Sequence, residues 1–356
     1  MTGRDGGAEH DHAGHGGHDH ASSGAPGRWG RVVARLRSHR HDGAASVDEA
    51  LRGSSRGLRA VGVSFGLLAV TALVQLGVVA LTGSVALLSD TIHNFTDAFS
   101  ALPLAVAFTL GRRAATRRLP HGYGRAEDLA GLVVVALIAA SALLAGHEAV
   151  SRLLAPAPVR SPGLVALAAL IGAGGNELVA RYRIRVGRQI GSAALVADGL
   201  HARSDALTSL AVLLGAGGVA LGLPAADPAV GLLIVVAILF VLRDAAREVI
   251  GRLMDAVDPA TAQHVEALAT AVVGVESVHA VHLRWTGHAL SASLAVIIDA
   301  ELTVAQGHAI AEHVRHELLH HVAHLATVTV HVDPSAHGDD PHAPLAHHTN
   351  PRFSLS

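Results

Sequence analysis

The sequence predicts a membrane domain of six helices followed by a small α+β domain. Half of the 356 residues are hydrophobic and only 16% are charged, which is typical of a membrane protein. Long apolar segments recur over residues 57–242, whereas residues 243–333 show the patterns of short helices and strands. Residues 1–56 and 334–356 are polar and contain many histidines, and we expect them to be disordered tails.

Each predicted span is a predominantly apolar stretch that polar or turn-forming residues interrupt or bound. The six spans are residues 60–81, 84–110, 129–145, 164–180, 192–221 and 229–242. Arginines gather before the first span, between spans two and three, between spans four and five, and after the sixth span. The other three loops hold only Arg152 and Arg160, so the positive-inside rule places both termini in the cytoplasm.

The segment after the sixth span changes to the alternation of a small α+β domain. A helix is expected to begin at Asp258, a plausible N-cap that Pro259 follows, and two strands flank a turn at Gly287 and His288. A second helix and a last strand complete the order α-β-β-α-β, which indicates a ferredoxin-like domain. The predicted elements are residues 258–272, 275–285, 289–299, 304–320 and 326–332.

One pattern occurs twice inside the apolar spans. "DTIHNFTD" (90–97) and "DGLHARSD" (198–205) both read Asp-x-x-His-x-x-x-Asp. On a helix these three positions fall within about 60° of one another, so they share one face. His93 lies nine residues after Ser84, at the outer start of its span, and His201 lies nine residues after Ser192, at the inner start. Both patterns therefore reach the middle of the membrane and can oppose each other.

Ionisable groups in lipid must pair, line water or bind an ion, because their burial is costly. Two imidazoles and two carboxylates from two helices provide a four-coordinate site that suits a tetrahedral cation such as zinc, with bonds of about 2.0–2.2 Å. Two carboxylates also neutralise one dication. The alternative is a hydrogen-bond network that holds two helices together, and the matched pair of patterns at equal depth disfavours it.

The leading aspartates have a more open assignment. We expect Asp90 and Asp198 to accept hydrogen bonds from the second ring nitrogen of the histidines, or to be polar groups near a water-filled vestibule. Direct binding of the metal is the alternative, and it is slightly less favoured. Arg203 points away from the His201 face and is expected to pair with a neighbouring carboxylate.

With these residues in view, the chain resembles the cation diffusion facilitator family over residues 56–333. The resemblance rests on six spans, on His-x-x-x-Asp in spans two and five, on "HGYGRAEDLAGL" opening span three, and on "HVDP" in the last strand. It implies a homodimeric secondary transporter that exports a divalent metal against proton entry, with His93, Asp97, His201 and Asp205 as the transport ligands. A bacterial inner membrane is the expected location.

The resemblance favours zinc, since oxygen ligands tend to replace the histidines in manganese-type members, and the softness of nitrogen donors points the same way. It also implies a cytoplasmic metal site in some members. His308, His331 and Asp333 match that site, His282 lies one residue from another matching position, and a further histidine is replaced near Ala295. The pattern is therefore incomplete, and zinc as a regulatory ligand of this domain is left open.

The remaining histidines are less specific. We expect His313, His316 and His320 to form a solvated helix face. Histidines near the N-terminus could capture zinc weakly or simply keep the tail soluble. The histidines of this cluster are His10, His12, His15, His18 and His20.

Several other functions are disfavoured. The net charge of −2 gives no reason to expect nucleic-acid binding, and no cysteine is available for a disulfide or a thiolate metal site. No nucleophile–base arrangement or phosphate-binding loop indicates an enzyme, and no cofactor is required. An exporter mainly of cobalt, nickel, iron or cadmium is the nearest alternative. A membrane-bound metal sensor or buffer is the alternative from another class, although a buffer has no reason to place its best ligands in lipid.

Overall fold

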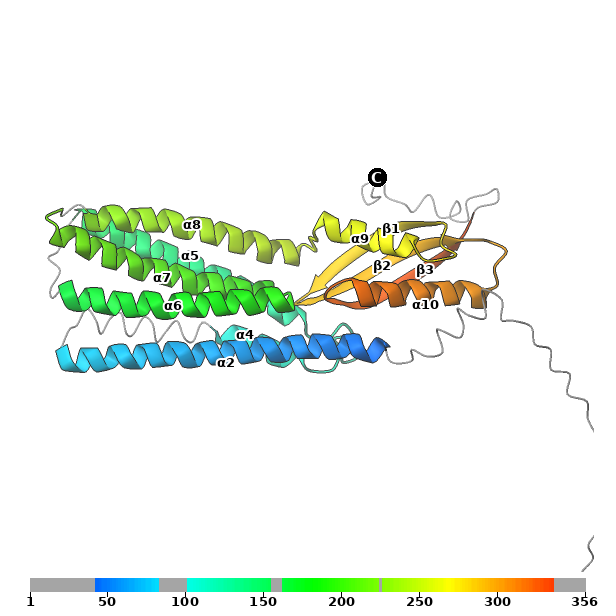
Figure 1. Cartoon of the computed structure of the whole chain (residues 1–356), viewed down its shortest axis with the longest axis horizontal. Helices are drawn as coiled ribbons and strands as arrows, with labels where there is room; N and C mark the ends of the chain where they lie inside the picture. The colour runs from blue at the N-terminus through cyan, green and yellow to red at the C-terminus, as the bar shows by residue number, and fades with distance from the viewer. Residues whose placement is uncertain (1–41, 83–100, 155–161, 224–225, 336–356) are drawn as a thin grey trace, which may run out of the picture. The chain divides into compact units, whose positions relative to one another are not determined.

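The computed structural model describes residues 42–82, 101–154, 162–223 and 226–335. Its long helices lie side by side in Figure 1, and contacts between residues join α6 to α7, α7 to α8, α5 to α8 and α2 to α6. The helices of the membrane domain are α2 (Asp42–Thr82), α4 (Leu102–Gly111), α5 (Arg125–Leu154), α6 (Pro162–Ile190), α7 (Ala193–Ala220) and α8 (Ala226–Leu253).

Five of the predicted spans fall within long helices, and α4 holds the end of the second span, whose residues 84–100 lie outside the described part of the chain. Among the described helices, three are long and apolar enough to cross a membrane, and α4 is a shorter apolar helix. The three are Leu51–Gly77, Arg125–Ser151 and Ala229–Leu253. The other two long helices, α6 and α7, contain more ionisable residues, and α7 carries His201 and Asp205 of the predicted transport site.

Two predicted boundaries differ from the structure. The helix α2 begins at Asp42, so residues 42–56 are helical and do not belong to a disordered tail. The helix α8 continues to Leu253, so the predicted domain boundary at residue 243 falls inside a helix. Both helices extend because polar and charged residues are compatible with a helix once it leaves the hydrocarbon layer, and a hydropathy pattern detects only the apolar part.

The cytoplasmic part has the predicted order α-β-β-α-β. Asp258 caps α9 (Pro259–Thr270) by accepting a hydrogen bond from the amide of Ala260 at 3.0 Å, as the sequence indicated. The strands β1 (Ser277–Thr286) and β2 (Ala289–Ile298) form an antiparallel hairpin. The helix α10 (Val304–His321) then connects β2 to a parallel third strand, β3 (Leu325–Pro334).

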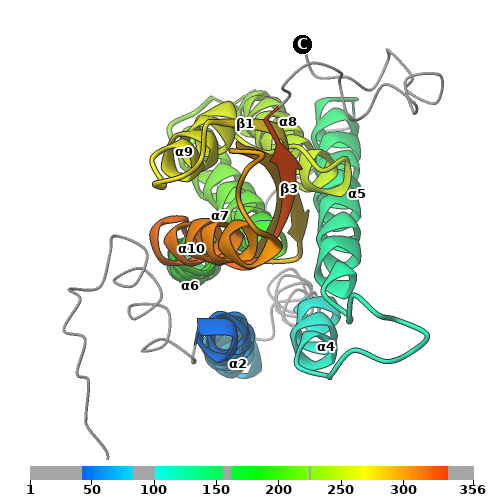
Figure 2. The same ribbon diagram turned by 90° about the vertical axis from the view of Figure 1, so that its right-hand side faces the viewer.

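The sheet has the order β1-β2-β3, and both helices cover one of its faces (Figure 2). Leu290, Leu294 and Val296 of β2 are buried against α9 and α10, and they alternate with residues whose side chains face the other side of the sheet. The period of two along β2 therefore separates a packed face from an open face, and the open face carries the histidines of β1 and β3.

The packing of α6 against α7 depends on glycines. A Cβ atom at Gly199 would lie 2.7 Å from Cγ1 of Ile184 and 3.1 Å from the carbonyl oxygen of Ala180. A Cβ atom at Gly187 would lie 2.9 Å from the backbone nitrogen of Val196. Such close backbone approach is typical of membrane helices that pack through small residues. It brings the inner halves of α6 and α7 into direct contact, where the ionisable residues lie.

We expect Gly199→Ala to destabilise the protein by about 1–3 kcal/mol, because the added methyl group meets backbone atoms that cannot move independently. Gly217→Ala on the same helix is the matched control, since nothing lies within 4 Å of its added carbon, and its effect should stay within about 0.5 kcal/mol. Thermal unfolding in detergent measures both. Equal shifts for the two variants would contradict the close packing of α6 and α7.

Candidate metal-transport site

The helix α7 carries the second octet, and all three of its ionisable residues are buried. Asp198, His201 and Asp205 are 0%, 3% and 4% exposed. Nδ1 of His201 lies 3.8 Å from Oδ2 of Asp205, one helical turn further along α7. A nitrogen donor and an oxygen donor are therefore held side by side, at a depth where an uncompensated carboxylate would be costly.

The first octet lies outside the described residues. Asp90, His93 and Asp97 belong to residues 83–100, so their approach to His201 and Asp205 stays a prediction. Within the described part of the chain, no three or more His, Asp or Glu side chains are grouped to hold a metal ion. Of the four predicted ligands, α7 carries His201 and Asp205.

Asp198 has a partner that the sequence analysis missed. Oδ2 of Asp198 lies 2.9 Å from Nη1 of Arg183 on α6, and both side chains are at most 1% exposed. Arg183 is one of the arginines between the predicted spans four and five, which were expected to form a cytoplasmic loop. In the structure α6 continues to Ile190, and Arg183 is buried. The sequence spacing could have indicated this pair. Arg183 lies about two helical turns before the α6–α7 turn, and Asp198 lies about two helical turns after it, so the two residues are at the same level of the hairpin.

Arg203 behaves as predicted and pairs with a carboxylate away from the His201 face. Its Nε lies 3.3 Å from Oε2 of Glu177 on α6, and Arg181 reaches the other oxygen of Glu177 at 2.7 Å. This group is more exposed than the Arg183–Asp198 pair. The α6–α7 contact therefore holds two separate ion-pair groups, one at the surface and one in the interior.

A second group of polar residues lies on the open face of the cytoplasmic sheet. Asp333 is buried and lies between two histidines, with its Oδ1 3.0 Å from Nε2 of His331 and its Oδ2 3.2 Å from Nε2 of His279. His279 and His331 both pair in register with Ala295 of the central strand, which explains why they meet at the same carboxylate.

In the sequence, His282 lies one residue from a position that matches this group, whereas in the structure His279 lies beside Asp333. A bulge between His279 and His282, with Ala280 at φ +52°, shifts the register of β1, so that His282 pairs with Ser293 further along the hairpin. His308 belongs to α10, which packs on the opposite face of the sheet.

The other histidines of α10 are half-buried or exposed, as expected for a solvated helix face. His313 and His321 each lie within 3.5 Å of a carboxylate oxygen of Glu317, and the rings of His316 and His320 are 4.4 Å apart.

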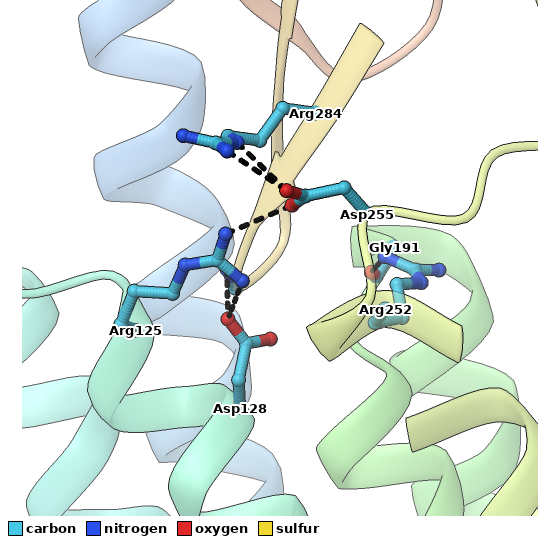
Figure 3. Close-up of polar contacts among 7 residues, drawn as sticks. Arg125, Asp128, Gly191, Arg252, Asp255 and Arg284 are labelled. Atoms are coloured by element: carbon cyan, nitrogen blue, oxygen red, sulfur yellow. Dashed lines mark hydrogen bonds and ion pairs between the residues drawn. The ribbon is translucent and has the colours of Figure 1, made fainter. Parts of the chain in front are cut away.

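Ion pairs join the inner end of α5 to the cytoplasmic domain (Figure 3). The guanidinium group of Arg125 lies 3.3 Å from Asp128 in the next turn of α5 and 2.9 Å from Asp255, which follows α8. Arg284 of β1 binds the other oxygen of Asp255 at 2.9 Å. Burial alone raises the pKa of the Asp255 carboxyl, but hydrogen bonds and charge from Arg125 and Arg284 outweigh it and hold the pKa below its ordinary value.

The turn between β1 and β2 inserts beside the same end of α5. Nδ1 of His288 lies 2.7 Å from Oε2 of the buried Glu127, and the amide of Gly287 donates to Oδ2 of Asp128 at 3.3 Å. Gly287 has φ +61°, and a Cβ atom there would lie 2.8 Å from Glu127 and 2.9 Å from the carbonyl oxygen of Gly124. Only glycine fits this position, so the predicted hairpin turn is also a contact between the domains.

Arg252 makes a third connection. Its guanidinium carbon lies 3.9 Å from the centre of a ring of Trp285 on β1. Its Nη1 donates to the carbonyl oxygen of Gly191 at 2.9 Å, and Figure 3 shows Arg252 beside Gly191. Gly191 forms the α6–α7 turn at φ +73°, so Arg252 at the end of α8 connects strand β1 to the hairpin that carries His201 and Asp205.

A helical membrane domain with buried histidine and aspartate, joined to a small α+β domain, defines a class of membrane metal transporter. Comparison with known families agrees: residues 61–254 match the cation efflux transmembrane domain, and residues 257–335 match the cytoplasmic domain of cation efflux proteins. The chain therefore belongs to the cation efflux family of divalent metal transporters, and it is not an enzyme.

Similar proteins come from several bacteria. The chain is 53% identical, over 90% of its length and 96% of the relative's, to a probable cation efflux system protein of Mycobacterium tuberculosis. It is 30% identical to magnetosome protein MamB of Magnetospira sp., over 71% of this chain and 87% of MamB. It is 28% identical to the cation-efflux pump FieF of Serratia proteamaculans, over 71% of this chain and 84% of FieF. These bacterial relatives indicate the inner membrane as its location.

The depressed pKa of Asp255 predicts a pH-dependent stability difference between the wild type and Asp255→Asn. A carboxylate whose pKa is lower in the folded protein than in the unfolded chain stabilises the folded protein at pH values above its unfolded pKa, which is near 3.8. This stabilisation is lost as the pH falls through the pKa of the folded protein. The wild type should therefore be the more stable protein at pH 7, and the difference should shrink below about pH 4.5. Thermal unfolding in detergent from pH 7 to pH 3.5 measures it.

Asp258→Asn is the control, because asparagine caps a helix as well as aspartate does and the variant also removes one carboxylate. Its stability difference from the wild type should be small. A difference for Asp255→Asn that stays constant down to pH 3.5 would show that Arg125 and Arg284 do not depress the pKa of Asp255.

Proposed function

We propose that the protein exports zinc from the cytoplasm in exchange for protons, as a homodimer, through a four-coordinate site of His93, Asp97, His201 and Asp205. One observation carries the proposal: His201 and Asp205 are both buried on α7, with donor atoms 3.8 Å apart. The same spacing recurs at His93 and Asp97 in an apolar span.

The donor set supports zinc. Two imidazole nitrogens and two carboxylate oxygens match the ligand types and the tetrahedral preference of zinc, and two carboxylates balance the charge of one dication. Hard, higher-coordinate ions such as manganese prefer oxygen-rich surroundings. Cobalt, nickel, iron and cadmium share enough of the zinc chemistry to remain alternative substrates.

The proton exchange follows from the chemistry of the ligands. Zinc binds neutral imidazole and ionised carboxylate, so loading of the site displaces protons and protonation of the site displaces zinc. A pH gradient across the membrane can therefore drive metal export. A homodimer is supported by the match to the cytoplasmic domain of the family.

A metal sensor or buffer that does not transport is the second candidate, and the histidine-rich tail and the His279–Asp333–His331 group favour it. The two functions differ in one observable, since a buffer binds zinc without moving it across a membrane. Uptake into reconstituted vesicles with an imposed pH gradient separates them.

Asp205→Ala removes one proposed ligand and leaves the exposed surface unchanged. We expect zinc flux in these vesicles to fall to the level of protein-free vesicles, because the remaining donors neither complete the coordination nor balance the charge. Asp244→Ala on α8 is the matched control, since Asp244 is exposed. Near-normal flux for Asp205→Ala would remove this residue from the transport site.

His201→Asp exchanges a nitrogen donor for a hard oxygen and adds a negative charge. The variant should transport zinc more slowly than the wild type, and its transport of manganese or cadmium should increase relative to that of zinc. The pH dependence of transport should also change, because a bound proton is then needed to balance the charge of the site. Competitive uptake of the three ions by the wild type and the variant tests this. An unchanged order of preference and an unchanged pH profile would exclude His201 as a ligand.

A further inference from the structure

The four ligands of the proposed zinc site do not include Asp198 or its partner Arg183, although Asp198 lies one helical turn before His201. Asp198 precedes His201 by three residues on α7, and its oxygen lies 2.9 Å from Nη1 of Arg183. Both side chains are fully enclosed by protein. A buried carboxylate three residues from a metal ligand would ordinarily be a candidate ligand or a candidate proton carrier, so its pairing needs a reason.

The surroundings leave Arg183 as the charge that balances Asp198. On α6, Glu177 is already paired with Arg181 and Arg203. The core around α7 includes the apolar residues Val134, Ile238 and Val249 of α5 and α8. The buried carboxylates of α5 have partners of their own, since Glu127 lies against His288 and Asp128 against Arg125 and the amide of Gly287. On α7 itself, the other ionisable residues are His201, Arg203 and Asp205.

The pair is also fixed in place. Close packing at Gly199 and Gly187 prevents α6 and α7 from separating without loss of contact, so Arg183 cannot leave Asp198 by a small movement. Removal of one partner would leave an uncompensated charge in the interior, and such a charge must recruit a proton or another cation. With both partners present, the charge of Asp198 is already balanced within the protein.

We propose that Arg183 is a positioning residue of the transport site: it balances the charge of Asp198 within the protein, so that Asp198 neither binds the metal nor takes part in the proton exchange. The inference rests on the proposed zinc–proton exchange and extends it. Arg183 thereby keeps Asp198 from adding a further proton to those that leave when one zinc ion binds.

The test counts the protons released when zinc binds to the full-length protein in detergent, by titration calorimetry in buffers of different ionisation enthalpy. The wild type, Arg183→Met, Asp198→Asn and the double variant Arg183→Met/Asp198→Asn are compared, and Arg183→Lys serves as the conservative control. All of these proteins have the same histidine-containing tails, so a difference in the number of released protons arises from the interior of the membrane domain. Chromatographic size and thermal unfolding identify the variants that fold.

The wild type, Arg183→Lys and the double variant should release the same number of protons per zinc ion. Arg183→Met should release up to one more, because Asp198 then carries a proton that metal binding displaces. The double variant decides the question even where a single variant does not fold, since it contains no unpaired charge. Fewer protons from the folded double variant than from the wild type would overturn the proposal, because Asp198 would then be a proton carrier in the native protein.

Failure of the proposed function gives a different result. If zinc binding to the wild type released no protons, or if Asp205→Ala left the number unchanged, the exchange mechanism itself would be contradicted, whatever Arg183 does. If the wild type releases protons, Asp205→Ala releases fewer, and the double variant differs from the wild type, only the role of Arg183 is contradicted.

Discussion

The cost of burying ionisable side chains in a membrane is the constraint on which this structure depends. Each such group on α7 has a partner or a proposed ion: Asp198 is balanced by Arg183, Arg203 by Glu177, and His201 and Asp205 by the proposed zinc ion. The helix hairpin α6–α7 can hold these groups because glycines allow its two backbones to approach closely. The transport site thus depends on its ligands and also on the ion pairs Arg183–Asp198 and Arg203–Glu177, which balance the neighbouring charges on α7.

The cytoplasmic domain contacts the membrane domain through polar groups at three places. Arg125 and Arg284 share Asp255, the Gly287–His288 turn contacts Glu127 and Asp128, and Arg252 lies between Trp285 and the α6–α7 turn. These contacts lie at the inner ends of α5, α6 and α8. A conformational change in the cytoplasmic domain therefore has a physical route to the helices that hold the site.

The sequence was sufficient for the fold because its signals are local. Apolar length, the N-cap at Asp258 and the period of two in β2 each predicted an element that the structure contains. Contacts between distant segments were not predictable in the same way. The pairing of Asp198 with Arg183 depends on how far α6 extends, and the pairing of Asp333 with His279 depends on a bulge in β1 that no residue pattern marks.

The central claim is that the two octets meet at one metal ion, and the absence of cysteine from the chain allows a direct measurement. In the variant His93→Cys/His201→Cys, both thiols should bind a single zinc or cadmium ion, because cysteine is also a zinc ligand. We predict that one metal ion per protomer protects both thiols from alkylation, as counted by mass spectrometry, and that Asp205→Ala in the same background weakens the protection. Independent alkylation of the two thiols, with metal protecting neither, would show that the octets do not meet and would contradict the proposed site.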